Sequence, residues 1–298
     1  MVGAGNDFVV IDGRSSLDFA RDSLWSSFVP RLRSGLPLVV VRRSLSDLAR
    51  SLCDRKIGIG ADGMLVLEKS KNADFRMRIF NPDGSEAEMC GNGLRCAILY
   101  VGMRGLQRHK DTKTQGHKDT SKKVRVETKA GIYNGEIVSK DRVKVRMEEP
   151  RDLRLNFPID LNERNIKVNY VNTGVPHTVI FVEGIDKIDV EDIGRAVRFH
   201  EAFKPKGTNV NFVEIIDDNN IKIRTFERGV EGETLACGTG AVASAIITSY
   251  ELRVTSYEIN VHTRGGTLKV RFNREGKKIK DVYLEGEAKE VFTGQMRT

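Results

Sequence analysis

Two cysteines, Cys90 and Cys237, each stand directly before a Gly-x-Gly triplet and a run of residues that is typical of a helix. A thiol at a helix start lies beside free backbone N–H groups and the positive end of the helix dipole, which lower its pKa. The same N–H groups bind a carboxylate, and glycine lets the backbone approach that carboxylate closely. Each Cys-Gly-x-Gly element therefore offers an acid–base group and half of an anion-binding site.

If the two elements face each other, they can hold one carboxylate with a sulfur atom on each face of the adjacent carbon. One thiolate would remove the α proton and the other thiol would deliver a proton to the opposite face, which inverts the carbon. The alternative is that Cys90 and Cys237 are small buried residues of the core, but the matching triplets favour a two-thiol site. Cys53 and Cys96 lack such surroundings and are expected in the core.

The elements that must position the thiols follow the same order in both halves of the chain. Residues 75–80 alternate like a half-buried strand before the first motif, and a helix is expected from Leu94 to about Val101. Strands at 210–215 and 221–226 precede the second motif, and a helix is expected over 240–250. Both helices are apolar nearly all round, which predicts that sheet surrounds them. The repeat predicts two similar α+β domains.

Other segments carry structural expectations only. A helix is predicted over 46–55, with Ser44 or Ser46 as its N-cap, and another over 190–198. Residues 38–41 could form a strand, residues 133–136 (Tyr-Asn-Gly-Glu) are predicted to be a tight hairpin turn, and residues 148–152 to be a linker. Residues 58–63 match G-x-G-x-x-G, but the helix precedes them and the strand follows, so a helix-to-strand turn is favoured over a nucleotide site.

Composition limits the class of protein. A chain of 298 residues can hold two domains of about 150. No apolar run approaches the roughly 20 residues of a membrane span, and residues 1–8 do not resemble a signal peptide, so a cytoplasmic protein without membrane association is expected. Four cysteines without a Cys-x-x-Cys pair do not predict a disulfide scaffold or a zinc site.

The formal net charge of +8 raises the alternative of nucleic-acid binding. Residues 104–125 contain eight Lys or Arg and two Asp, so this segment alone contributes +6. Within it, residues 107–123 are of low complexity and contain a repeated His-Lys-Asp-Thr, which is typical of a solvated loop. The rest of the chain is nearly balanced, and no nucleic-acid partner is expected.

The motifs resemble those of a known family, the diaminopimelate epimerases. Asn81-x-Asp83-Gly84-Ser85-x4-Cys90-Gly91-Asn92-Gly93-x-Arg95 agrees with the family signature at every defining position. Four further segments agree, and they are Gly5-Asn6-Asp7-Phe8, Gly58-x-Gly60-x-Asp62, Gly207-Thr208-Asn209, and Glu227-Arg228-Gly229 running to Ala236-Cys237-Gly238-Thr239-Gly240. Matching segments extend over nearly the whole chain, apart from 14–44 and 107–123.

This resemblance implies interconversion of LL- and meso-diaminopimelate, in lysine and peptidoglycan precursor synthesis, without pyridoxal phosphate, other cofactor or metal. It implies an α+β fold of two similar domains related by pseudo-two-fold symmetry, each a curled, mostly antiparallel sheet or barrel around a central helix. The N-terminal domain would comprise residues 1–148 plus about 285–298, and the C-terminal domain residues 149–284. The partner would be a small-molecule diamino dicarboxylate in the cleft between them, and a homodimer is a candidate assembly.

The resemblance also implies roles for single residues. Cys90 and Cys237 become the two acid–base residues. The reacting carboxylate would be bound by Gly91, Asn92, Gly238 and Thr239, and the amino groups and the distal carboxylate by Asn6, Asn81, Asn209, Glu227 and Arg228. The chemistry agrees independently, because an Arg fork reads a planar carboxylate and Glu with Asn suits an ammonium group. An ordinary surface pair is the alternative for Glu227 and Arg228, and a structural or capping role is expected for Glu88 and Glu233.

The chain departs from the family pattern in a few places. Many members have Gly-Asn-Pro-His where this chain has Gly174-Val175-Pro176-His177, so Val175 leaves one distal contact unfilled. Asn172 is a candidate substitute, and His177 is a candidate cleft residue rather than a base. Many members have Gln at the position of Gly63, and the residues that usually precede Gly3 are absent, which predicts a missing or shortened first strand.

Two alternative functions remain open, one suggested by these departures and one by the two thiols. One is a cofactor-independent racemase of another amino acid on the same fold. The other is a redox-switch or binding protein in which Cys90 and Cys237 form a disulfide.

Overall fold

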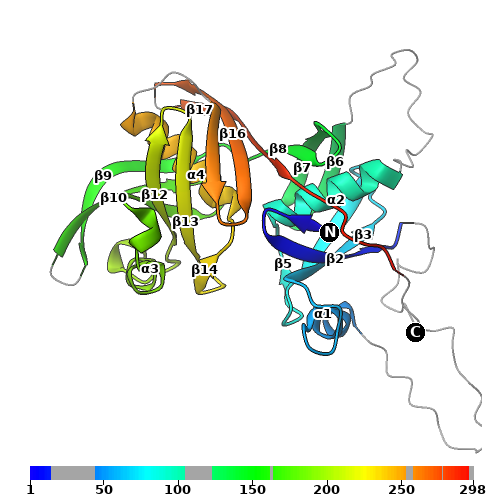
Figure 1. Ribbon diagram of the computed structural model, residues 1–298. Helices are drawn as coiled ribbons and strands as arrows, with labels where there is room; N and C mark the ends of the chain where they lie inside the picture. The colour runs from blue at the N-terminus through cyan, green and yellow to red at the C-terminus, as the bar shows by residue number, and fades with distance from the viewer. Residues whose placement is uncertain (15–43, 105–122, 162–163, 253–257, 277, 295–298) are drawn as a thin grey trace, which may run out of the picture.

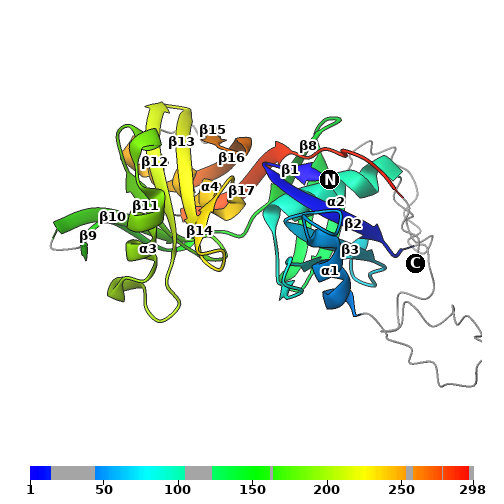
Figure 2. The same ribbon diagram turned by 60° about the horizontal axis from the view of Figure 1, so that its bottom comes forward.

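Two α+β lobes make up the computed structural model, which describes residues 1–14, 44–104, 123–161, 164–252, 258–276 and 278–294 (Figures 1 and 2). The first lobe is built from β1 (Val2–Gly3), β2 (Asn6–Asp12), α1 (Leu45–Cys53), β3 (Gly63–Glu68), β4 (Phe75–Phe80), β5 (Glu86–Ala87), α2 (Gly91–Arg104), β6 (Lys123–Thr128), β7 (Gly131–Ile137) and β8 (Arg142–Arg146). The second lobe is built from β9 (Arg151–Leu161), β10 (Arg164–Asn172), β11 (Pro176–Phe181), α3 (Val190–Arg198), β12 (Asn209–Asp217), β13 (Asn220–Glu227), β14 (Gly232–Thr234), α4 (Gly238–Glu251), β15 (Glu258–Thr263), β16 (Gly266–Glu275) and β17 (Lys278–Glu287), with short 3₁₀ turns at Ile185–Lys187 and Glu201–Phe203.

The same strand order occurs twice. In the first lobe β2 runs parallel to β3, β3 antiparallel to β4, β4 parallel to β6, and β6, β7 and β8 form an antiparallel meander. In the second lobe β11, β12, β13, β15, β16 and β17 repeat these relations in the same sequence. The central helix enters at the same point of each set, after β5 in one lobe and after β14 in the other. The two-domain α+β fold expected from the sequence is therefore confirmed.

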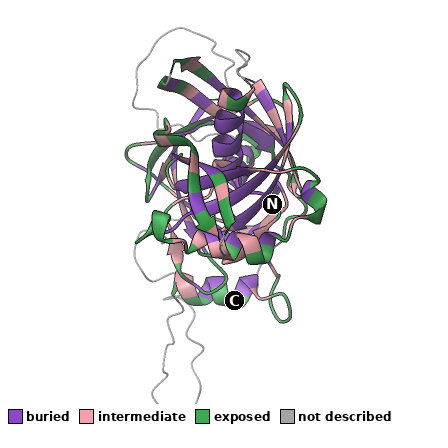
Figure 3. Cartoon of the chain, turned by 90° about the vertical axis from the view of Figure 1, so that its left-hand side faces the viewer, coloured by how far each residue is buried: buried purple, intermediate pink, exposed green. Residues whose placement is uncertain are grey.

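A helix lies at the centre of each lobe. α2 contacts β1, β2, β3, β4, β7 and β8, and α4 contacts β10 to β13 and β15 to β17. This arrangement explains why both helices lack a polar face, because sheet covers nearly every side of them. The buried residues, purple in Figure 3, gather inside the curled sheets. Cys96 belongs to this core and Cys53 to a separate buried cluster that includes residues of α1, so both are core residues as predicted.

β17 joins the lobes. It pairs with β16 on one side and with β8 of the first lobe on the other, and Figure 1 shows it running from one lobe towards the next. Beyond it, an isolated bridge pairs Lys289 with Val2 of the short strand β1. These pairings agree with the predicted domain boundaries, residues 1–148 plus about 285–298 and residues 149–284, in which the C-terminal segment returns to the first domain. The boundaries themselves stay predictions. No helix in the described ranges is long and apolar enough to span a membrane.

Local sequence rules explain several elements. Ser44 caps α1, and the Asp47 side chain accepts a hydrogen bond from the Ser44 backbone N–H in return, which completes a capping box. α3 spans Val190–Arg198 as predicted, and residues 58–62 connect α1 to β3, which begins at Gly63, so the predicted helix-to-strand connection is confirmed. The strand suggested at 38–41 lies outside the described residues, as do 105–122 of the basic segment.

The hairpin turn predicted at residues 133–136 is wrong, because these residues lie inside β7 and the chain turns at 129–130 instead. Gly135 has another reason to be glycine. A Cβ atom there would overlap Ile98 Cδ1 of α2, so the missing side chain lets the helix approach the sheet. The linker predicted at 148–152 is also too long, since β9 begins at Arg151.

Gly135→Ala is expected to lower the free energy of unfolding by about 1–3 kcal/mol, the usual cost of overpacking a core. Because the obstructing atom is Ile98 Cδ1, adding Ile98→Val should recover part of this loss although Ile98→Val alone destabilises. Urea unfolding of the two single variants and the double variant checks this. Equal losses with and without Ile98→Val would contradict the packing explanation.

Candidate active site

Both helices begin directly after their cysteines. α2 starts at Gly91 and α4 at Gly238, so each starts earlier than the sequence predicted. The carbonyl oxygens of Cys90 and Cys237 accept the first helical hydrogen bonds, from Leu94 N at 2.8 Å and Ala241 N at 2.9 Å. Each thiol therefore stands at a helix N-terminus, beside backbone N–H groups that have no partner within the helix.

The two helix starts approach each other across the lobes. Asn92 Nδ2, two residues after Cys90, donates to the carbonyl oxygen of Ala236 at 3.4 Å. Leu284 of β17 lies between the starts, because its Cδ2 is 4.0 Å from the Cβ position of Gly91 and 2.9 Å from that of Gly238. A side chain at position 238 would require Leu284 to shift, so glycine lets this helix start approach Leu284 closely.

Burial dominates the charge state of the thiols. Burial and, to a smaller extent, the charge of Glu227 raise the pKa of Cys237 to about 12, although the contacts with Thr239 and Gly240 act to lower it. Burial also raises the pKa of Cys90, which Glu227 raises as well, against the lowering effect of the Gly93 backbone. The sequence predicted that the helix starts would lower the pKa of both thiols. This prediction is wrong, because the net change in each pKa is upward. Without substrate, both thiols are protonated at neutral pH.

A chain of hydrogen bonds leads to Cys237 from within the second lobe. Asn211 Nδ2 donates to Thr178 O and to His177 Nδ1, both at 3.1 Å. His177 must then donate from Nε2 to Thr239 Oγ1, 2.9 Å away. Thr239 Oγ1 lies 3.5 Å from Cys237 Sγ, and its own hydrogen is free to point there.

His177 is fully buried, and burial lowers its pKa to about 3, helped by the positive charge of Arg228. The imidazole is therefore neutral, and its hydrogen-bond partners fix its tautomer. A group with so low a pKa is a poor base, and the cleft position of His177 stays a prediction.

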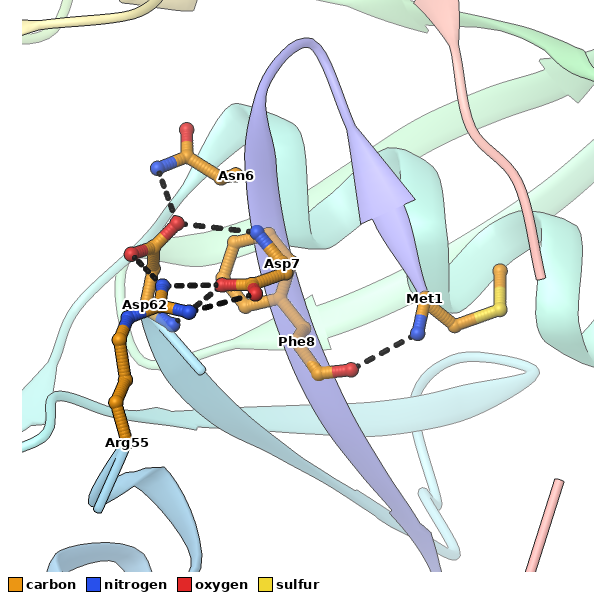
Figure 4. A network of polar contacts seen from close by, with 6 residues as sticks. All are labelled: Met1, Asn6, Asp7, Phe8, Arg55 and Asp62. Carbon is orange, nitrogen blue, oxygen red and sulfur yellow. Dashed lines mark hydrogen bonds and ion pairs between the residues drawn. The ribbon is translucent and has the colours of Figure 1, made fainter. Parts of the chain in front are cut away.

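The first lobe holds Asn92 and Asn6 together. Asn92 is buried, accepts from Arg95 Nη2 at 2.7 Å through Oδ1, and donates from Nδ2 to Asn6 Oδ1. Asn6 in turn donates to Asp62 Oδ2 at 3.3 Å, as Figure 4 shows. Two residues predicted to bind opposite parts of a substrate are thus in direct contact.

Glu227, Arg228 and Asn209 come together at the end of β13. Burial raises the pKa of Glu227, whose Oε2 accepts from Thr234 Oγ1 at 3.0 Å. Asn209 is buried and uses Oδ1 to accept from the backbone N–H of Arg228 at 2.8 Å. No acidic side chain in the described part of the chain pairs with the Arg228 guanidinium, which contacts only Lys206 O at 3.4 Å. These residues are not a mutual surface pair, and Arg228 has capacity for a carboxylate.

The structure does not bring every predicted residue to this place. Asn81 is exposed in a turn and donates to Ser85 Oγ at 2.9 Å. Asn172 accepts from the Gly174 backbone N–H at 3.0 Å. Among the described residues, no hydrogen bond joins either amide to the thiols. Glu233 forms ion pairs with Arg224 at 2.7 Å and Arg264 at 3.0 Å, which matches its expected structural role.

Two residues of the site were missed by reasoning from the sequence. Asn211 points inward from a buried strand, between the apolar residues Val210 and Phe212, and a polar residue in such a strand was the available signal. Arg95 was noticed only as part of a motif, although a charged residue inside an apolar helix is itself unusual.

Solved structures share this fold. They include a probable proline racemase from Agrobacterium radiobacter K84, 19% identical with a TM-score of 0.61, covering 81% of this chain and 78% of that one. A PhzF family phenazine biosynthesis protein from Bacillus anthracis is also 19% identical, with a TM-score of 0.58, covering 78% of this chain and 84% of that one. The fold is that of the two-domain class which includes racemases and epimerases.

The diaminopimelate epimerase family model matches residues 1–153 and 169–291. Similar proteins include the diaminopimelate epimerases of Aquifex aeolicus (strain VF5), 42% identical over 99% of this chain and 95% of that protein, and of Chlorobaculum tepidum, 37% identical over 99% and 98%. The chain belongs to the diaminopimelate epimerase family and is an isomerase of the amino-acid epimerase type. The resemblance seen in the sequence motifs is confirmed.

Glu227→Gln is expected to increase the reactivity of both active-site thiols. The Glu227 charge raises the pKa of Cys90 and of Cys237, so its removal should increase the thiolate fraction. One pKa unit corresponds to a tenfold change, and we expect alkylation by iodoacetamide at pH 8 to accelerate about threefold to tenfold. Peptide mass spectrometry without substrate measures each cysteine separately.

Glu231→Gln provides the matched control. It removes the same charge nearby, from a side chain that pairs with Arg198 at 3.0 Å, and thiol reactivity should stay at the wild-type level. Unchanged or slower alkylation in Glu227→Gln would contradict the electrostatic coupling.

Proposed function

We propose that the chain interconverts LL- and meso-diaminopimelate by proton transfer between Cys90 and Cys237, as a step in lysine and peptidoglycan precursor biosynthesis. One observation carries this proposal: two cysteines at two helix starts, brought together across the lobes by Leu284 and by the contact from Asn92 to Ala236. A substrate carboxylate between the helix starts would receive backbone N–H donors from both sides. The α carbon would then lie between the two sulfur atoms.

The chemistry balances without an outside reagent. A thiolate on one face takes the α proton, so the Cα–H bond breaks and an S–H bond forms. The electron pair left at carbon is delocalised into the carboxylate, which the helix N–H groups stabilise as its charge grows. The thiol on the other face then gives its proton to carbon, and the two cysteines have exchanged roles.

Burial suits the thiols to this task. An α proton beside a carboxylate is very weakly acidic, and a thiolate whose pKa is raised is a stronger base. The cost is that little thiolate exists in the empty site. The substrate ammonium group beside Glu227 would cancel the charge that raises both thiol pKa values, so binding would favour thiolate formation.

The distal half of the substrate fits the end of β13. Arg228 can form a bidentate pair with a carboxylate, while Glu227 and the amide groups of Asn209 and Asn6 suit an ammonium group. Val175 cannot replace a hydrogen-bonding residue at its position, which keeps a racemase of another amino acid as the second candidate function. A homodimer stays a prediction from the resemblance.

Cys90→Ala and Cys237→Ala are each expected to lower the rate of epimerisation of LL-diaminopimelate by at least about 10²- to 10⁴-fold, the usual contribution of one acid–base group. Each variant loses the group on one face of the carbon, so neither direction of reaction can finish. A coupled assay of meso-diaminopimelate formation measures this without added cofactor.

Cys53→Ala is the control, because Cys53 is another buried free thiol and lies in a separate core cluster of the first lobe. It should keep wild-type activity. Normal epimerisation in both active-site variants would refute the two-thiol mechanism, and a redox role would then be the better explanation.

Arg228→Gln should raise KM for LL-diaminopimelate about 10- to 100-fold, because a charge-assisted pair to the distal carboxylate is lost. The α-proton exchange of an amino acid that has no distal carboxylate should change little. Deuterium uptake by both compounds measures the two effects. Exchange with another amino acid but none with diaminopimelate would favour the second candidate function.

A further inference from the structure

Two charged residues of the family motifs, Arg95 and Asp62, have no task in this mechanism. Arg95 lies in the first turns of α2 and is fully buried. Its guanidinium donates to Asn92 Oδ1 at 2.7 Å and to Gly91 O at 3.4 Å, whereas its Nε has no partner. No carboxylate in the described residues pairs with it. A buried cation without an anion is costly, so stability alone does not explain Arg95.

Asp62 stands at the other side of the same contacts. Its Oδ2 accepts from Asn6 Nδ2 at 3.3 Å and from the Asp7 backbone N–H at 3.1 Å, and its Oδ1 accepts from Arg55 at 2.7 Å. Figure 4 shows Asn6 and Arg55 on either side of this carboxylate. The Arg55 and Asp62 side chains are 58% and 39% exposed, and ion pairs at such exposure contribute little stability.

The two ends fix the direction of every hydrogen bond between them. Arg95 can only donate, so Asn92 must present Oδ1 to it and Nδ2 to Asn6. The Asp62 carboxylate can only accept, so Asn6 must present Nδ2 to it and Oδ1 to Asn92. With either amide reversed, two donors or two acceptors would face each other.

We propose that Arg95 and Asp62 are positioning residues that set the amide orientations of Asn92 and Asn6 for substrate binding. The proposal rests on the proposed function, because the Asn6 amide is a substrate ligand there and Asn92 holds that amide in place. In this orientation Asn92 uses both Nδ2 hydrogens within the protein, on Asn6 Oδ1 and Ala236 O. Asn6 keeps one hydrogen and one lone pair for the ligand.

The second lobe contains the same arrangement in the equivalent strands. Thr239, also two residues after its cysteine, contacts His177 of β11, which contacts Asn211 of β12. In the first lobe the corresponding contacts run from Asn92 to Asn6 of β2 and on to Asp62, directly before β3. β2 with β3 and β11 with β12 are the matching parallel pairs. In each lobe, the side chain above the helix start is held through two neighbouring parallel strands.

Asp62→Ala tests the proposal, with Asp7→Ala as matched control. Asp7 binds the same Arg55 and is 37% exposed against 39% for Asp62. Its Oδ1 also accepts from the Asp62 backbone N–H at 2.8 Å, but its side chain does not contact Asn6. Asp62→Ala should raise KM for LL-diaminopimelate about tenfold with kcat changed less than about threefold, because the interaction with Asn6 exists in both the ground state and the transition state. Asp7→Ala should change KM less than about twofold. Equal effects, or an unchanged KM in Asp62→Ala, would overturn the proposal.

A double variant tests transmission through the amides. Arg95→Lys keeps the charge but replaces the two guanidinium nitrogens that donate to Gly91 O and Asn92 Oδ1 with a single ammonium nitrogen, and it should also raise KM. Either substitution disrupts the same series of hydrogen bonds from Arg95 through Asn92 and Asn6 to Asp62. The double variant Asp62→Ala with Arg95→Lys should therefore raise KM about as much as the more severe single variant does. Asp7→Ala with Arg95→Lys should give the product of the single effects. If the KM increases of Asp62→Ala and Arg95→Lys multiply in the double variant, coupling through the two amides is contradicted. If Arg95→Lys does not fold, the comparison of Asp62→Ala with Asp7→Ala decides.

The amides can also be observed without catalysis. With ¹⁵N-asparagine labelling, Asp62→Ala should shift the side-chain NH₂ signals of Asn6 and Asn92, whereas Asp7→Ala should leave the Asn92 signal in place. An unshifted Asn92 signal in Asp62→Ala would overturn the positioning role. If the wild-type chain does not epimerise diaminopimelate, the proposed function fails and this measurement still decides the orientation of the amides.

Discussion

The start of α2 and the start of α4 pack against one side chain, Leu284. This contact ties the positions of the two thiols to β17, the strand that pairs with both lobes. A Cβ atom at Gly238 would force Leu284 to shift, and the same absence of side chains leaves the helix N–H groups open to a ligand. The spacing of the thiols is therefore a property of the sheet that joins the domains as well as of the cysteine motifs.

Two opposing effects act on the thiols once they are placed there. The helix starts favour the thiolate, while burial and Glu227 favour the thiol, and the second pair of effects is larger. The site thus gains base strength at the expense of thiolate population. A substrate that brings an ammonium group to Glu227 and a carboxylate to the helix starts changes this balance only when it is bound, which limits reactive thiolate to the occupied site.

Local patterns predicted much of the fold. The alternation before each motif, the apolar helices and the capping signals of α1 are all determined by neighbours in sequence, and the repeated order of elements was enough to expect two domains. Predictions from the sequence were wrong or missing where a contact between residues far apart in the chain determines the local structure. An Asn-Gly pair that is typical of a turn lies in β7 because Ile98 of α2 needs the space. No strand was predicted over 151–161. This strand, β9, contains Pro158 and pairs with β10 alone among the strands of the described residues, and proline is tolerated at such an edge.

In the candidate site too, some features follow from local sequence and others depend on contacts between distant residues. The cysteines and their glycines were predicted from residue types and spacing, and Glu227 from the family resemblance. The contacts of Asn211, His177 and Thr239 depend instead on the register of parallel strands. Asn81 begins an exposed turn in contact with Ser85. The Pro-Asp-Gly that follows it is a turn signal, whereas the resemblance implied a role in substrate binding.

The central claim is that Cys90 and Cys237 act on opposite faces of one carbon. Its most direct measurement follows the initial reaction of LL-diaminopimelate in D₂O. The account predicts that newly formed meso product carries deuterium at the inverted carbon while unreacted LL substrate still retains its hydrogen, because the second thiol delivers a proton from solvent. Product that retains the substrate hydrogen would show that a single base carries the proton across, and would contradict the two-thiol account.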